Sequence, residues 1–509
     1  MDRPSKSHSF GKSGLAHWMR RAVKERARAA ARLDPDAVHD LRVALRHCLS
    51  FADAATEFDP HSGWKSLKHS AKQLLKHLGH LRDSQVLLHW LDDLGFSTTA
   101  QGQALKESLF QQESRLCAEA HAALADFDLR KWKSWAKQLA PRAEPVLPGS
   151  PAAQYLALER WTEAYRLHRF ALRSRSKISF HRLRIAIKDF RYSLEFFLPD
   201  LHAAWVSDLK YLQDALGERH DLDVLWRRVA NSKSLDEITK TEWRERIVAG
   251  QQEHLAQYLA KTKGKTSLWL AWRAALPQGE RLDEAALAAL AAWSSFRAPD
   301  FDDSRRVAGL ALTLFDAFAA RSLAGGFPTS RPRTILQAAA LLQEVGRSKR
   351  AKGYHKTSYR MIRQLPLPIG WQHGDLELTS LVARYHRKAL PQLKHKEFRA
   401  LPASSRHATL FLVGILRLAN CFAHSAGTTI RKFELDLTPE GIVIQAYGFE
   451  GGAQLVSKLA DAKHLLEIAC RRSILIIPGA AGAPLRVAAA GASPSPAKPL
   501  PVRALRAHA

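Results

Sequence analysis

Two short segments about 140 residues apart carry the same set of side chains suited to binding phosphate. His39-Asp40-Leu41-Arg42-Val43-Ala44-Leu45-Arg46 is matched by His181-Arg182-Leu183-Arg184-Ile185-Ala186-Ile187-Lys188. On a helix, the basic residues of each segment fall on one face: His39, Arg42 and Arg46 in the first, and His181, Arg184, Lys188 and Arg191 in the second. Arginine offers a two-pronged donor, lysine a point charge and histidine one or two ring N–H groups. The pattern therefore indicates a polyanion-binding surface.

A third basic stripe follows the first motif. Lys65, Lys68, Lys72 and Lys76 share one face of a predicted helix, and no acidic residue of that helix interrupts them. Like charges at this spacing repel by a few tenths of a kcal/mol per pair. The unrelieved repulsion indicates a ligand that supplies negative charge. The alternative is a solvated helix face, and His39 and His181 could equally be capping or core residues.

The motifs lie on amphipathic helices that repeat in order. The apolar faces are Leu41, Leu45 and Cys48 in the first copy, and Leu183, Ile187, Phe190 and Leu194 in the second. Further along, residues 78–87 match residues 216–225, again about 140 residues apart. Residues 15–270 are therefore predicted to be two copies of one helical unit, joined by a proline-rich linker at 141–151. In the second block, Asp83, Asp221 and Asp223 follow glycines expected to end helices, which favours helix N-caps or partners of the basic helices over catalytic acids.

The overall charge agrees with an anionic ligand. The 509 residues include 77 Lys+Arg and 49 Asp+Glu, a formal net charge of +28. Such an excess attracts nucleic acid, an acidic membrane surface or another polyanion, unless it is merely a basic surface. The four cysteines form no Cys-x-x-Cys pair, the N-terminus lacks the apolar stretch of a signal peptide, and the most apolar run, near 410–416, is too short for a bilayer. We expect a cytoplasmic protein without membrane contact.

The remaining chain shows three further changes of pattern. A turn interrupts the helices at 58–63, and a second break follows at 277–283 before helices resume to about residue 425. Alternating residues at 432–437 and 442–447, separated by Thr-Pro-Glu-Gly, predict a β-hairpin. Residues 479–509, rich in Ala, Pro and Gly, predict a disordered tail.

The repeated blocks, together with residues 189–197, resemble the CHAD domain (conserved histidine α-helical domain). The resemblance covers about residues 12–270, with copies at about 12–140 and 152–270. It implies a mainly α fold of two four-helix bundles related by a pseudo-twofold axis, and a basic channel or surface that binds inorganic polyphosphate, often on polyphosphate granules. The family's basic residues correspond here to His39, Arg42, Arg46, His181, Arg184, Lys188 and Arg191, and more weakly to Lys65, Lys68, Lys72, Lys76 and Lys210.

Residues 283–478 resemble a second family. Segments 353–359 and 382–391 look like the C-terminal helical domain of exopolyphosphatase / guanosine pentaphosphate phosphohydrolase proteins, which is HD-like. The HD metal positions correspond to Asp303, Gln343-Glu344 and Asn420, so no histidine ligand remains and the carboxylates left would hold a transition metal poorly. This implies a domain without metal or catalysis. It could be a second anion site, supplied by His355, Lys356, Arg384, His386, Arg387 and Lys388, or these residues could cap and pack locally.

These features favour a polyphosphate-binding protein with no catalytic residues and no cofactor, associated with polyphosphate granules. A metal-dependent phosphohydrolase acting on polyphosphate or nucleotides is the alternative, although the actin-like half that carries exopolyphosphatase catalysis is not found. General nucleic-acid binding is a third possibility. The basic stripes lack the interleaved aromatics that stack on bases, which argues against specific recognition of single strands.

Overall fold

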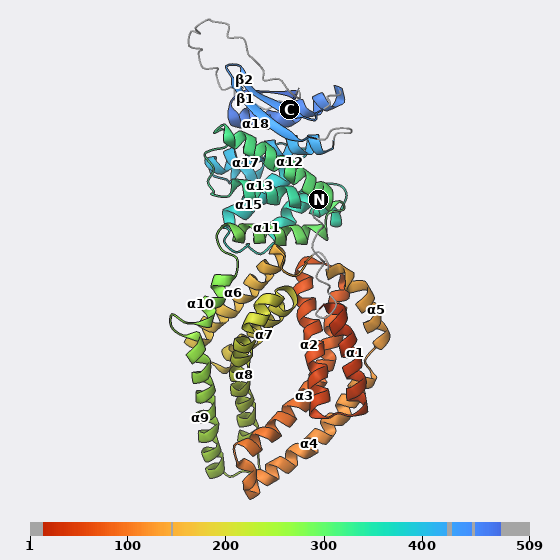
Figure 1. The fold of residues 1–509 in the computed structure, drawn as a ribbon, viewed down its shortest axis with the longest axis vertical. Coiled ribbons are helices and arrows are strands. Elements are labelled where there is room, and N and C mark those ends of the chain that lie inside the picture. Colours follow the sequence, from red (N-terminus) through yellow and green to blue (C-terminus); the bar gives the residue numbers. More distant parts are fainter. Residues whose placement is uncertain (1–13, 144–145, 425–429, 450–452, 480–509) are drawn as a thin grey trace.

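The computed structural model describes residues 14–143, 146–424, 430–449 and 453–479 (Figure 1). The predicted tail lies outside the described residues, apart from its first residue, Gly479. Within them the chain is mainly helical, with one small sheet near the C-terminal end.

The first ten helices form two similar series. The first is α1 (Leu15–Ala31), α2 (Pro35–Phe58), α3 (Ser62–Asp93), α4 (Ala100–Ala125) and α5 (Leu129–Leu139), with the 3-10 turns η1 (Phe96–Thr98) and η2 (Pro141–Ala143). The second is α6 (Pro151–Ser174), α7 (Lys177–Phe197), α8 (Pro199–Ala230), α9 (Glu237–Thr262) and α10 (Leu268–Ala275). Helices α3 and α8 each have 32 residues, and α4 and α9 each have 26. The structure therefore repeats where the sequence repeats.

The two series share their core. One apolar cluster draws on α1, α2, the first part of α3, α6, α7 and α8, so the repeats are not separate bundles with separate cores. The hairpins α3–α4 and α8–α9 extend away from it and meet at their far ends, as Figure 1 shows. A second apolar cluster joins them there, and Phe96 stacks on Trp243 with ring centroids 4.1 Å apart.

Two sequence expectations are wrong in these helices. Gly79 and Gly217 do not end helices, because α3 and α8 continue through them. Asp83, Asp221 and Asp223 therefore lie in mid-helix and are not N-caps. The predicted apolar faces are correct: Leu41, Leu45, Leu183 and Ile187 are fully buried.

The described residues of the C-terminal part form eight helices and three strands. The helices are α11 (Glu280–Ser295), α12 (Phe301–Ala320), α13 (Pro332–Leu342), α14 (Tyr354–Arg363), α15 (His373–Tyr385), α16 (Lys396–Arg399), α17 (Ala403–Ala423) and α18 (Ala453–Cys470), with the 3-10 turn η3 (Val345–Ser348). The predicted hairpin is present as β1 (Lys432–Thr438) and β2 (Gly441–Tyr447), with Leu435 opposite Ile444. A third strand, β3 (Ser473–Gly479), was not predicted from the sequence; it pairs in parallel with β2 and makes the sheet mixed.

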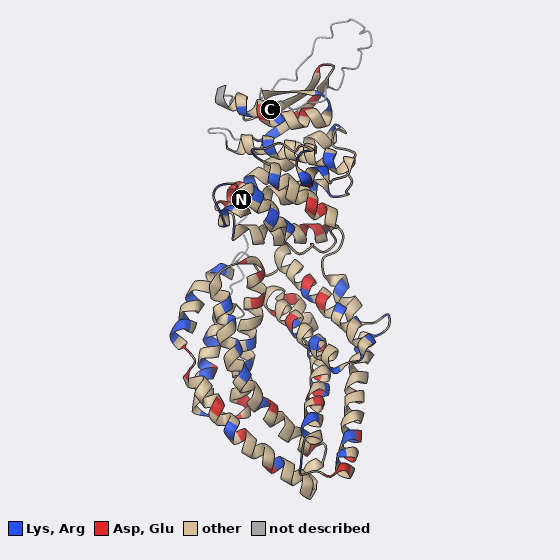
Figure 2. Cartoon of the chain, turned by 180° about the vertical axis from the view of Figure 1, so that it is seen from behind, with Lys and Arg blue, Asp and Glu red and all other residues tan. Residues whose placement is uncertain are grey.

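Helix α11 joins the two parts. Its Ala285, Ala286, Ala289 and Ala292 belong to the first core, whereas Leu290 belongs to the core of the C-terminal part. Figure 2 shows Lys and Arg along the helices of both parts, with Asp and Glu among them. The net positive charge is therefore not confined to one element, and local geometry must identify any binding site.

Candidate anion-binding surfaces

The start of each motif helix sets which way its basic residues face. Asp34 caps α2 by accepting a 2.7 Å hydrogen bond from the amide of Ala37, and Ser176 caps α7 through the amide of Ser179 at 3.2 Å. Neither His39 nor His181 is a cap. Leu41 and Leu183 are fully buried, which fixes the rotation of each helix about its axis. The basic stripe of each helix therefore lies at the edge of the core.

The basic stripes of α2 and α7 converge. Arg42 donates a hydrogen bond of 3.2 Å to the carbonyl oxygen of Leu75 in α3. Burial, with the positive charges of Arg46, Arg82 and Arg184, lowers the pKa of Arg42 to about 10. Burial, then Arg184, Arg46 and Arg42, lowers the pKa of Lys188 to about 6. Cations of both repeats thus act on one another, and we call Arg42, Arg46, Arg184 and Lys188 the central basic cluster.

The central basic cluster is only partly neutralised. Burial raises the pKa of Asp221 to about 6, against the opposing charges of Arg184 and Lys188. Asp83 is the second carboxylate that acts on Arg42 and Arg184, which agrees with its predicted role as a partner of the basic helices. None of the four cations forms an ion pair within 4.0 Å in the part of the chain that the structure describes. The Nε of Arg184 is buried without a hydrogen-bond partner there.

The two motif histidines lie beside this cluster. Burial lowers the pKa of His39, as do Arg82, Arg46 and Arg42, with Asp40 opposing. Burial, Arg184 and Lys188 lower the pKa of His181, whose ring centroid lies 4.7 Å from that of His220. The residues that sequence reasoning missed are Arg82, His220 and Arg227. Arg82 and His220 stand in the second repeated block, where only the carboxylates were considered.

Two predicted residues lie apart from the central basic cluster. Arg191 donates a hydrogen bond of 2.8 Å to Oε1 of Gln213. Its charge acts on His47 and His202, and burial followed by Arg191 lowers the pKa of both histidines. Lys210 is exposed on α8.

The lysine stripe of α3 faces a different depression. Lys65 and Lys76 line a hollow between α3 and the α4–α5 segment, together with His69, His77 and Lys131. The repulsion between these lysines is partly relieved, because Lys68 pairs with Asp53 of the neighbouring α2. The sequence of α3 alone does not reveal this pair. Lys72 is exposed. The structure thus brings together the two His–Arg/Lys motifs, but not the lysine stripe with them.

The predicted second anion site gathers at the start of α14 and the end of α15. Burial, followed by the charges of Lys388, Arg387, Lys356 and Arg384, lowers the pKa of His355 to about 4. Lys356, Arg387 and Lys388 are exposed, so their charges face solvent. His386 packs locally instead: it is buried, and its Nδ1 donates a hydrogen bond of 2.7 Å to the carbonyl of Ala383. Five of the six predicted residues therefore form one basic patch around His355.

Of the residues that the sequence resemblance placed at HD metal positions, Gln343 and Asn420 hydrogen-bond to each other. Nδ2 of Asn420 donates to Oε1 of Gln343 at 2.9 Å, and Nδ1 of His424 donates to the carbonyl of Asn420 at 2.8 Å. Nε2 of His424 lies 3.0 Å from a carboxylate oxygen of Asp303. Glu344 turns elsewhere and accepts a hydrogen bond of 2.9 Å from Tyr354. Among the described residues, no group of three or more His, Cys, Asp or Glu is placed to hold a metal ion.

Comparison with known proteins assigns both parts of the chain. Residues 14–230 match the family described as CHAD domain, and residues 294–445 match the family described as Ppx/GppA phosphatase, domain III. The crystal structure of the CHAD domain from the plant Ricinus communis is similar at 23% sequence identity over 52% of this chain and 90% of that chain, with a TM-score of 0.35. No curated protein matches this chain. Across its described residues, the chain has no helix both long and apolar enough to cross a membrane.

Proposed function

Since the chain carries a CHAD domain over residues 14–230 and a Ppx/GppA phosphatase domain III region over residues 294–445, we propose that it binds inorganic polyphosphate without catalysing a reaction. The observation that carries the proposal is the central basic cluster. Its four cations come from both repeats and feel the charges of Asp83, Asp189 and Asp221, but none of the four forms an ion pair within the described residues. A phosphate chain would supply the missing negative charge along both helices.

A filter-retention assay of long-chain polyphosphate binding to the full chain, at several salt concentrations, tests this proposal. Changing Arg42, Arg46, Arg184 and Lys188 to Gln should weaken binding more than about tenfold and make the salt dependence shallower, because fewer counterions are displaced. The matched control changes four exposed cations elsewhere, Lys24, Arg130, Lys133 and Lys137, to Gln. No binding at low salt, or equal binding by the cluster variant and wild type, would overturn the proposal.

Two further features belong to the same proposal. The surface that a long ligand follows extends from the central basic cluster to His39 and His181. A weaker contribution comes from Arg191, Lys210 and the lysine stripe. The basic patch around His355 is a second anion site on the C-terminal part, since three of its cations face solvent. Changing Lys356, Arg387 and Lys388 to Gln should reduce the number of phosphate units held per chain, with the central basic cluster intact.

The proposed setting is the cytoplasm, on polyphosphate granules. A fluorescently tagged chain should co-localise with granules, and the cluster variant should be dispersed. Competition between polyphosphate and DNA separates this function from general nucleic-acid binding. DNA that displaces polyphosphate at equal phosphate concentration would favour nucleic acid as the ligand.

We also propose the architecture that this function uses. The CHAD unit spans 12–270 as two copies related by a pseudo-twofold axis, and an HD-like unit spans 283–478. The matched lengths of α3 with α8 and of α4 with α9 support the two copies. A metal-dependent phosphohydrolase remains the second candidate, favoured by the match to domain III. Phosphate release that needs Mg²⁺, Mn²⁺ or Co²⁺ and is lost in Glu344→Gln would establish it.

A further inference from the structure

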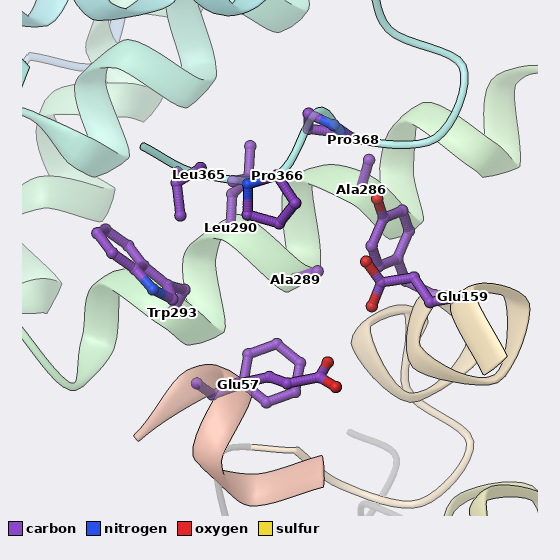
Figure 3. Close-up of a pocket in the computed structure, with 11 residues that line it drawn as sticks. Glu57, Glu159, Ala286, Ala289, Leu290, Trp293, Leu365, Pro366 and Pro368 are labelled. Carbon is purple, nitrogen blue, oxygen red and sulfur yellow. The ribbon is translucent and has the colours of Figure 1, made fainter. Parts of the chain in front are cut away.

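A pocket opens where the N-terminal helices meet the C-terminal part. It is lined by the end of α2, by α6, by α11 and by the loop between α14 and α15, and its volume is about 110 Å³. Figure 3 shows Glu57 and Glu159 turned toward one space, which Leu290, Trp293 and Pro366 bound from the other side. This volume is smaller than the roughly 150 Å³ of apolar cavities that hold benzene, so a ligand enclosed in the pocket must be smaller than benzene. The pocket therefore suits a small organic ligand.

The polar groups of the pocket are unevenly neutralised. Glu57 pairs with Arg160. Glu159, by contrast, has neither an ion pair nor a hydrogen bond from any residue that the structure describes. Tyr155 is already engaged, since its hydroxyl oxygen accepts a hydrogen bond of 2.9 Å from the amide of Ile369. Of the nearby cations, Arg297 stacks on Trp293 at 4.0 Å and donates to the carbonyls of Phe58 and Trp293.

We propose that this pocket binds an organic cation, namely a primary amine with a small apolar body. The ammonium group would pair with Glu159 beside Glu57, and the body would lie against Leu290, Trp293 and Pro366. A carboxylate pair on an apolar wall excludes anions and gives a neutral molecule no charged partner. This ligand has the opposite charge to polyphosphate, and its site lies apart from the central basic cluster. Because the walls come from both parts of the chain, an occupied pocket holds them together.

The proton on Glu159 links this binding to pH. Burial and the charge of Glu57 raise the pKa of Glu159 to about 7, and Arg160 opposes them. Below that value Glu159 is mostly protonated and offers no charge to an ammonium group. Amine affinity should therefore rise as the pH increases from about 6 to about 8, and then level off.

Calorimetric titration of the full chain with n-butylamine, and with its uncharged counterpart 1-butanol, tests the proposal. The amine should bind at pH 8 with a dissociation constant below about 1 mM, and the alcohol about tenfold or more weakly. Glu159→Gln should lose about tenfold in amine affinity and lose the pH dependence. Glu163→Gln, one turn along α6 and outside the pocket, should bind as wild type does.

A second variant keeps the test independent of the charge change. Ala289→Leu fills the pocket while leaving both carboxylates in place, and it should also abolish amine binding. Equal binding of amine and alcohol would overturn the proposal. So would no detectable amine binding at pH 8, or unchanged affinity in a folded Glu159→Gln or Ala289→Leu variant.

Discussion

Asn420 and Gln343 are joined by a hydrogen bond of 2.9 Å between their side-chain amides, at two of the positions that the sequence resemblance matched to HD metal ligands. Asn420 also donates to the carbonyl of Leu416 at 2.8 Å, which fixes its orientation on α17. Gln343 is almost fully buried. Neutral amides that satisfy each other offer a metal ion far less than histidine and carboxylate do. At this place the contact links α13 to α17 and contributes to stability.

This contact predicts coupled stability effects. Gln343→Ala and Asn420→Ala should each lower the free energy of unfolding by about 1–2 kcal/mol, because each removes the partner of the other amide, which is half-buried for Asn420 and buried for Gln343. The loss of unfolding free energy in the double variant should be smaller than the sum of the two single losses by about 0.5–1.5 kcal/mol. Denaturant unfolding of the four proteins measures this coupling, with Gln364→Ala, which is exposed, as the control. Strict additivity would show that the amides do not stabilise each other.

Lys188 should oppose folding while it promotes binding. It lies among Arg42, Arg46 and Arg184, which together with burial lower its pKa to about 6. Lys188→Met keeps an unbranched side chain of similar size and removes an amine that folding must either deprotonate or hold among like charges, so we expect about 1 kcal/mol of added stability and weaker polyphosphate binding. Chemical denaturation and filter binding measure the two effects, with the exposed Lys133→Met as the control. A variant that is both less stable and unchanged in binding would assign Lys188 a packing role only.

The same lysine should make polyphosphate binding take up protons. In the free protein its pKa of about 6 leaves it mostly neutral at pH 8, whereas a bound polyanion favours the charged form and raises that pKa. Titrations at pH 8 in buffers of different ionisation enthalpy should show net proton uptake, which Lys188→Met reduces. Without ligand, Lys188 binds its proton more tightly in the unfolded chain than in the folded one. The free energy of unfolding should therefore increase as the pH rises above about 6. Equal proton uptake by Lys188→Met and wild type would exclude Lys188 as the source.

Sequence periodicity was sufficient to find the motif helices but not their neighbours. The phase of His39, Arg42 and Arg46 followed from spacing alone, and the buried Leu41 confirms it. Spacing could not reveal that Asp53, on another helix, approaches Lys68, because that contact depends on how α2 packs against α3. The expectation that Gly79 ends a helix was also wrong. Gly79 lies inside α3, where the side chain of Arg42 passes 3.1 Å from the position a Cβ would take. A close approach between helices, not a helix end, accounts for that glycine.

The strand β3 was missed for a related reason. Its sequence, Ser-Ile-Leu-Ile-Ile-Pro-Gly, is short, and its partner β2 lies beyond helix α18. A hairpin can be predicted from the sequence of its turn, whereas the sequence of a parallel strand does not indicate which strand it pairs with. The pocket at the junction was equally invisible, because Glu57, Glu159 and Pro366 come from three distant segments.

The turn between α2 and α3 depends on one buried carboxylate. Asp59 is 2% exposed and accepts hydrogen bonds from Nε1 of Trp64 at 2.8 Å and from Arg142 at 2.6 and 2.8 Å. Burial alone would raise the pKa of Asp59, but the hydrogen bonds from Arg142, Trp64 and the amide of His61 outweigh it and hold the pKa below its usual value. Through Arg142, this carboxylate ties the segment after α5 to the end of α2.

Asp59→Asn should therefore lower the free energy of unfolding by about 2 kcal/mol at pH 7, a value reduced because Arg142 is partly exposed. A carboxyl whose pKa is lower in the folded state stabilises the fold above its unfolded pKa of about 4, and loses that contribution as the pH falls through the folded value. The difference between wild type and Asp59→Asn should thus shrink in acid. Denaturant unfolding at pH 7 and near pH 3 measures it, with the exposed Asp93→Asn as the control. A difference that stays constant between the two pH values would mean that the ionised carboxylate is not what holds this turn.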